Sequence, residues 1–203
     1  MKRTHLIGLT ITSLLVLASA ARIVHAGDAA RASANSRTCS EAIASFLKEP
    51  TARNYDEMRR LKADACSSTL TNSQIQSLDH LTAGGNKLAA QLLAPAVRRL
   101  DGGELEDALR ALGRYSVYDM RSFLSMVATG SLTQHEASDA LTMLPLELED
   151  QFDAQLAALR TRRTAVEKVH DAQLQGAAKS AIEAIDNSIT EVEAARTGQR
   201  ASK

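Results

Sequence analysis

From residue 38 onward, apolar side chains recur every three or four positions, and short segments containing glycine or proline interrupt them. The interruptions include Pro50, Gly84, Gly102 and Gly130. Apolar residues at this spacing lie on one side of an α-helix, and glycine and proline are the residues that most often end a helix. The pattern therefore predicts an all-α fold, a compact multi-helix bundle built from short helices that bury one side each.

Individual positions predict where the helices of residues 38–145 begin and end. Pro95 removes a backbone hydrogen bond, so it should kink a helix or divide it after Leu93. Gly113 is expected to close a short helix, and Ser116 is expected to cap the next one. The sequence Thr-Gln-His-Glu that starts at Thr133 has the form of a capping box and predicts another helix start.

The segment 146–196 differs because it contains one glycine, Gly176, and is dense in charge. Its apolar residues predict either one long amphipathic helix or a helical hairpin that turns near residues 173–179. The single long helix is favoured, since one glycine costs only about 1 kcal/mol in a helix and no cluster of turn residues surrounds it. Residues 197–203 are expected to form a disordered tail. The apolar side of this segment is a possible interaction face, made of Phe152, Leu156, Leu159, Val166, Ile182, Ile185, Ile189 and Val192.

The two cysteines, Cys39 and Cys66, predict a disulfide bond. Cys39 begins one expected helix, and Cys66 ends the next, which should open near Asn54. In an antiparallel hairpin these two ends meet, which is the geometry a disulfide needs. Neither a C-x-x-C spacing nor an adjacent histidine suggests a reactive thiol, so a structural bridge that staples an N-terminal helical hairpin is the favoured interpretation.

Residues 1–26 have the layout of a secretory signal peptide. Lys2 and Arg3 precede an apolar stretch, and small residues lead up to a cleavage site expected after Ala26, with Ala20 as the alternative. The apolar stretch is about 15 residues long, too short to cross a bilayer, so no stable membrane span should remain after cleavage. We therefore expect a periplasmic or secreted protein that begins with a flexible leader over residues 27–37.

Removal of residues 1–26 would leave 21 basic and 24 acidic residues. A slightly negative chain is not expected to bind nucleic acid or anionic lipid through its overall field. The whole sequence contains no tryptophan and only three tyrosines and three phenylalanines, which is few for platforms on which bases or sugars stack.

No catalytic, cofactor-binding or metal-binding residues are predicted. His80, His135 and His170 lie on separate expected helices without the spacing of metal ligands. The acidic clusters are explained by helix N-termini and solvation. The basic residues Arg160, Arg162 and Arg163 are interpreted as a solvated helix face, and the aromatic and methionine side chains of residues 115–126 mainly as core.

These observations predict an exported, non-catalytic α-helical protein that binds another envelope protein or itself, with the segment 146–196 as the contact. Two alternatives remain from other classes. One is a small envelope enzyme whose site is assembled from carboxylates on separate helices. The other is a ligand-sequestering helical protein.

Overall fold

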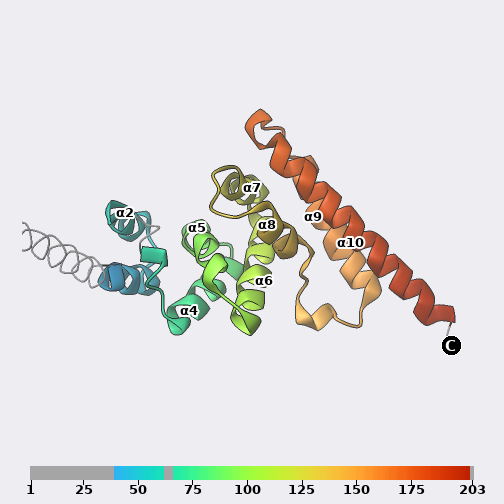
Figure 1. Ribbon diagram of the computed structural model, residues 1–203, viewed down its shortest axis with the longest axis horizontal. Coiled ribbons are helices and arrows are strands. Elements are labelled where there is room, and N and C mark those ends of the chain that lie inside the picture. Colours follow the sequence, from blue (N-terminus) through green and yellow to red (C-terminus); the bar gives the residue numbers. More distant parts are fainter. Residues whose placement is uncertain (1–38, 62–65, 202–203) are drawn as a thin grey trace, which may run out of the picture.

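The computed structural model describes residues 39–61 and 66–201, and within these ranges every regular element is a helix. The all-α prediction is therefore confirmed. Figure 1 shows the elements laid out along the long axis in chain order, from a small N-terminal arm through a central group of helices to a long helical hairpin at the opposite end.

The N-terminal arm consists of a first helix over residues 39–48 and of α2 (Ala52–Arg60), and the predicted disulfide joins Cys39 to Cys66. The two Cα atoms are 5.1 Å apart. The expected cap at Asn54 is wrong, because α2 is capped by Thr51. Asn54 instead donates its side-chain amide to the carbonyls of Ser45 and Glu49 and so closes the preceding helix.

The central group contains five α-helices and one 3-10 helix, and it holds most of the buried side chains. Their bounds are α4 (Asn72–Ala83), α5 (Lys87–Leu93), η1 (Ala94–Arg99), α6 (Gly102–Tyr118), α7 (Met120–Ala128) and α8 (Gln134–Thr142). The division at Pro95 is confirmed, since α5 ends at Leu93 and a 3-10 helix follows. The capping box at Thr133 is confirmed as well.

The expectation that Gly113 ends a helix and Ser116 caps the next is wrong. Both residues are buried inside α6, which continues to Tyr118, and Asp119 caps α7. Gly113 has a packing role instead: a Cβ atom at this position would overlap the carbonyl oxygen of Ala140 in α8. The absence of a side chain therefore allows α6 and α8 to approach closely, which outweighs the cost of a glycine within a helix.

The C-terminal segment is a hairpin, so the favoured prediction of one long helix is wrong. It comprises η2 (Leu146–Leu148), α9 (Phe152–Glu167), η3 (Ala172–Leu174) and α10 (Gln175–Ala201), and α9 packs along α10 (Figure 1). The chain reverses before Gly176, at Asp171, whose carboxylate accepts the backbone N–H of Gln173 and binds Arg121 of α7 at 2.7 Å. Helix α10 also continues past Arg196, where the tail was expected to begin.

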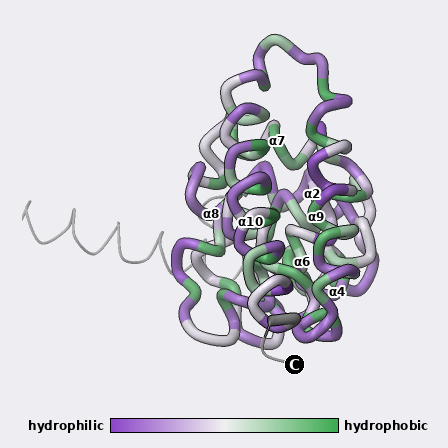
Figure 2. The backbone as a smooth tube through the Cα atoms, turned by 90° about the vertical axis from the view of Figure 1, so that its right-hand side faces the viewer, coloured by the Kyte–Doolittle hydropathy of each residue, from purple (hydrophilic) through white to green (hydrophobic). Residues whose placement is uncertain are grey.

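No helix of the described ranges is long and apolar enough to span a membrane, and Figure 2 shows hydrophobic and hydrophilic residues alternating along the helices. The predicted signal peptide of residues 1–26 and the leader of residues 27–37 lie outside the described residues. The Cys39–Cys66 disulfide is the kind of bond that an oxidising compartment permits.

Candidate functional site

The exposed large hydrophobic side chains of the described residues gather on one surface. Val117 is 50% exposed, Tyr118 is 67% exposed and Leu146 is 61% exposed. The first two close α6, and Leu146 begins η2. A groove of about 410 Å³ lies between these elements and α9, and we call it the Tyr118 groove. It is lined by Ala83, Arg114, Val117, Tyr118, Pro145, Leu148, Ala158, Thr161 and Arg162.

A glycine holds the Tyr118 ring in place at one end of the groove. Gly85 has a φ of 88°, a conformation that side-chain-bearing residues rarely adopt. A Cβ atom on Gly85 would also lie 3.0 Å from Cγ of Tyr118, so the ring packs directly on the glycine backbone. The turn between α4 and α5 therefore supports an aromatic ring that remains largely open to solvent on its other side.

A buried arginine fixes the opposite wall of the groove. Arg162 of α9 is only 3% exposed and donates to the carbonyls of Leu141 at 2.6 Å and Met143 at 3.1 Å. Burial, together with the charge of Arg114, lowers the pKa of Arg162 to about 10, so the side chain stays charged at neutral pH. Its prediction as part of a solvated face is therefore wrong. It caps the C-terminal end of α8 and thereby positions the segment that starts at Pro145.

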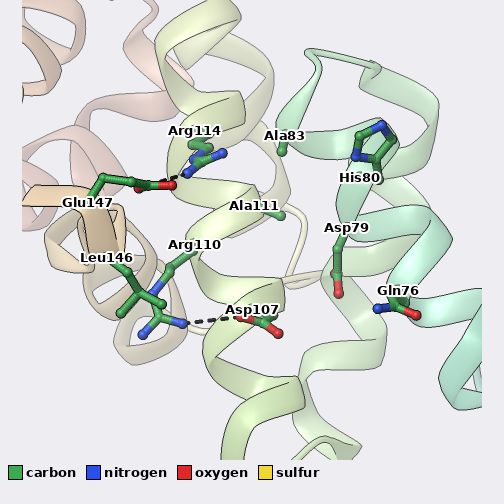
Figure 3. A pocket seen from close by; sticks show the side chains of 10 residues that line it. All are labelled: Gln76, Asp79, His80, Ala83, Asp107, Arg110, Ala111, Arg114, Leu146 and Glu147. Atoms are coloured by element: carbon green, nitrogen blue, oxygen red, sulfur yellow. Dashed lines mark hydrogen bonds and ion pairs between the residues drawn. The ribbon is translucent and has the colours of Figure 1, made fainter.

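The Tyr118 groove adjoins a second concavity, which we call the Asp79 pocket (Figure 3). It has a volume of about 300 Å³ and shares Ala83 and Arg114 with the groove. Figure 3 shows carboxyl groups reaching it from two helices, Asp79 from α4 and Asp107 from α6. Its lining comprises Gln76, Asp79, His80, Ala83, Asp107, Arg110, Ala111, Arg114, Leu146 and Glu147.

Asp79 is the electrostatic anomaly of this pocket. Its Oδ1 atom is buried and has no hydrogen-bond partner. Burial raises the pKa of Asp79 to about 7, with further contributions from the charges of Asp107 and Glu104. A carboxyl group with this pKa changes its charge near neutral pH, which an ordinary aspartate does not do.

The arginines that line the Asp79 pocket are already bound to other carboxylates. Arg110 pairs with Glu106 at 2.9 Å and with Asp107 at 3.2 Å, and Arg114 contacts Glu147 at 3.5 Å. Neither guanidinium is paired with Asp79. The pocket therefore has an acidic group whose negative charge is not compensated, beside an apolar groove.

The predicted interaction face does not lie open. Four of its eight residues, Leu156, Leu159, Val166 and Ile185, are buried in the structure. The others, Phe152, Ile182, Ile189 and Val192, are half-buried. The predicted interaction face is thus largely covered within the chain, because α9 and α10 pack against each other in the hairpin.

The other residues considered in the sequence analysis do not come together in one site. Within the described residues, no three or more histidine, cysteine or acidic side chains are placed to hold a metal ion. Met120, Phe123, Met126 and Tyr115 are buried in the core, as the core interpretation predicts, whereas Tyr118 is exposed. Sequence reasoning missed Asp79, since a single aspartate on a helix has no distinguishing pattern until a second helix covers it.

Comparison with protein-family models, with curated protein sequences and with solved structures gave no match to this chain.

Proposed function

We propose that the protein is exported, non-catalytic and binds another protein, and that the partner inserts a segment with apolar side chains followed by a lysine or arginine. The observation that carries the proposal is the gathering of Val117, Tyr118 and Leu146 beside an uncompensated acidic group. Exposed apolar surface next to a polar pocket is typical of protein-binding sites. The apolar side chains would occupy the Tyr118 groove, and the basic one would reach Asp79.

The charge of the Asp79 pocket is the reason for expecting a basic residue. A cation placed beside Asp79 would supply the opposite charge that Arg110 and Arg114 do not provide. Since the pKa of free Asp79 is raised to about 7, binding of a cation requires loss of its proton near neutral pH. Affinity is therefore expected to rise between about pH 6 and about pH 8.

The experiment begins with site-specific photocrosslinking in intact cells. A photoreactive residue at Val117 is expected to capture the partner, and the same residue at Thr190, on the exposed side of α10, serves as the matched control. The captured protein is then purified and its affinity is measured. Tyr118→Asp is expected to reduce affinity by about 2 kcal/mol or more, the effect of a central aromatic contact.

Three outcomes would contradict this proposal. If Val117 and Thr190 capture the same proteins with equal yield, the groove is not the binding surface. If Asp79→Asn leaves both the affinity and its pH dependence unchanged, the partner does not use the carboxylate. If Val117 captures only a second copy of this chain, the protein binds itself rather than another protein.

Export is part of the proposal and has its own test. The N-terminus of the protein isolated from the cell envelope is expected to begin after Ala26, or after Ala20 if the alternative site is used, as determined by mass spectrometry. Recovery of the chain from the cytoplasm with Met1 retained and both cysteines reduced would contradict export.

The Asp79 pocket also favours one second candidate, the carboxylate-based envelope enzyme. A carboxylic acid with a raised pKa beside a second carboxyl group, that of Asp107, resembles the arrangement of an acid catalyst and its neighbour. Glycoside hydrolysis uses such a pair. A panel of chromogenic glycosides tests this alternative: turnover that disappears in Asp79→Asn but persists in Tyr118→Asp would support the enzyme over the binding protein.

A further inference from the structure

A second pocket lies between the N-terminal arm and the central helices, and it has a different chemistry from the Asp79 pocket. Its volume is about 360 Å³, and its walls come from α2, from α5 with the start of η1, and from α7 with the turn after it. We propose that this pocket binds a small anion that also carries hydroxyl groups, such as a sugar acid or a sugar phosphate. The polar side chains that carry the proposal are Arg59, Lys87, Ser122, Ser125, Thr129 and Ser131.

Two cations on opposite walls supply the positive charge. Arg59 of α2 contacts Asp56 at 4.0 Å, and Lys87 of α5 contacts Asp119 at 3.8 Å. Both ion pairs are long and at least a third exposed, so each contributes little and leaves the cation available to an incoming anion. Among the described residues that line the pocket, none carries a carboxylate. An anionic group is therefore attracted from two sides, and the carboxylates paired with the two cations, Asp56 and Asp119, lie outside the lining.

Hydroxyl groups line the third wall. Ser122, Ser125 and Thr129 are separated by three and four positions on one side of α7 and its C-cap, and Ser131 follows with its Oγ 3.4 Å from the Thr129 hydroxyl. A hydroxyl both donates and accepts hydrogen bonds. The Thr129 hydroxyl donates to the Ser125 carbonyl at 2.9 Å and keeps its acceptor lone pairs, so the row can accept hydrogen bonds from the hydroxyl groups of a ligand.

The floor of the pocket is apolar. Leu92 and Met126 are buried there, and the half-buried Pro95 and Tyr55 complete the surface. The Tyr55 ring is held against Phe46 of the first helix, with 6.1 Å between the ring centroids. A sugar ring has C–H groups on one face and hydroxyl groups around its edge, so this floor and these walls match its two surfaces.

Calorimetric titration of the purified, oxidised protein with four probes tests the proposal. The probes are glucuronate, glucose 6-phosphate, glucose and inorganic phosphate. Glucuronate or glucose 6-phosphate is expected to bind at least about tenfold more tightly than glucose or phosphate, since one charge-assisted hydrogen bond contributes about this factor. Whichever of the two anions binds more tightly shows whether the pocket prefers a carboxylate or a phosphate group.

Variants locate the binding in the pocket. Arg59→Gln and Lys87→Gln are each expected to weaken binding of the better probe by about tenfold. Arg60→Gln is the matched control, because Arg60 is the next residue after Arg59 in α2 and does not line the pocket. Circular dichroism confirms that each variant is folded.

Several results would overturn the inference. Absence of heat with all four probes at millimolar concentration would exclude a site of this class. Equal binding of phosphate and glucose 6-phosphate would show an inorganic anion site without a role for the hydroxyl groups. Equal losses in Arg60→Gln and Arg59→Gln would place the ligand elsewhere. None of these results bears on the Tyr118 groove, which lies on other elements.

Discussion

The two ends of the described part of the chain are both helical hairpins, but only one of them contains a covalent link. At the N-terminal end, the Cys39–Cys66 disulfide ties the first helix, over residues 39–48, to the chain beyond α2, which ends at Arg60. At the C-terminal end, α9 and α10 are longer and bury a stripe that includes Leu159 and Ile185. Ile43, Phe46 and Met58 of the N-terminal end are fully buried, but its helices are short, so the covalent link supplements a smaller apolar contact.

Ion pairs distinguish the C-terminal hairpin further. Arg160 binds Glu193 at 2.9 Å, Arg163 binds Asp186 at 2.6 Å, and Arg196 binds Asp153 at 2.7 Å. Each pair joins α9 to α10 along the edge of the buried stripe. Because exposed ion pairs contribute little, we expect the stripe to supply the stability of this hairpin and the ion pairs to select its register.

Removal of the disulfide is expected to have the largest effect. In the chain-entropy model a bridge across this separation contributes about 3.5 kcal/mol. The double variant Cys39→Ala and Cys66→Ala should lose most of this free energy of unfolding in denaturant titration. Hydrogen exchange should accelerate in residues 39–61 and remain slow in α9 and α10. Equal acceleration at both ends would show that the two hairpins are not independent.

Truncation of a side chain in the apolar stripe is expected to have the second-largest effect on the free energy of unfolding. Leu159 is fully buried in α9, so Leu159→Ala should lower the free energy of unfolding by about 3 kcal/mol through lost burial and the cavity left behind. The neighbouring Ala157→Ser, at an exposed position of the same helix, is the matched control and should have little effect. A loss below that of the control would mean that the stripe does not hold the hairpin together.

In the helices between the two hairpins, Asp79 makes a contribution to the free energy of unfolding that depends on pH. Its pKa is raised from 3.8 when unfolded to about 7 when folded, so the folded state holds the proton more tightly. The contribution to stability is therefore present at acidic pH and is lost as the pH rises through about 7. Asp79→Asn should raise the melting temperature at pH 8 by about 2–4 °C and by less near pH 5, because the contribution is lost progressively from about pH 4 to about pH 7. An equal shift at both pH values would contradict the raised pKa.

Loss of one ion pair in the C-terminal hairpin is expected to have the smallest effect. Arg160→Gln removes the contact with Glu193 and should lower stability by less than about 1 kcal/mol, an effect that added salt reduces further. The measurement is denaturant unfolding at low and high salt. A loss as large as that of Leu159→Ala would reverse the roles assigned to the ion pairs and the stripe.

Much of the fold could be predicted locally, because the signals act between residues close in sequence. The 3–4 spacing predicts helices, Pro95 predicts the division of a helix, and Thr133 predicts a helix start, since each depends on the backbone hydrogen bonds of a few neighbouring residues. The bond between Cys39 and Cys66 could be predicted because the chain contains only these two cysteines. The expectation that Cys66 ends the second helix is wrong, since α2 ends at Arg60.

The errors occur where a distant part of the chain outweighs a local preference. Gly113 continues a helix because Ala140 packs against it, and Arg162 is buried because the α8 carbonyls accept its hydrogen bonds. The chain reverses at Asp171 with the help of Arg121, a residue far away in sequence. None of these partners is visible within a window of neighbouring residues.

The sequence by itself determined the helical class, the disulfide and the apolar sides of the helices, because these depend on composition and on short-range spacing. Only the tertiary structure decided which apolar side chains stay exposed and which acidic side chain is desolvated by burial. Tyr118 is open because the chain turns at Asp119, and Asp79 is unusual because α6 covers it. Exposure and desolvation depend on what the rest of the chain places over a side chain, and that is settled only when the helices pack.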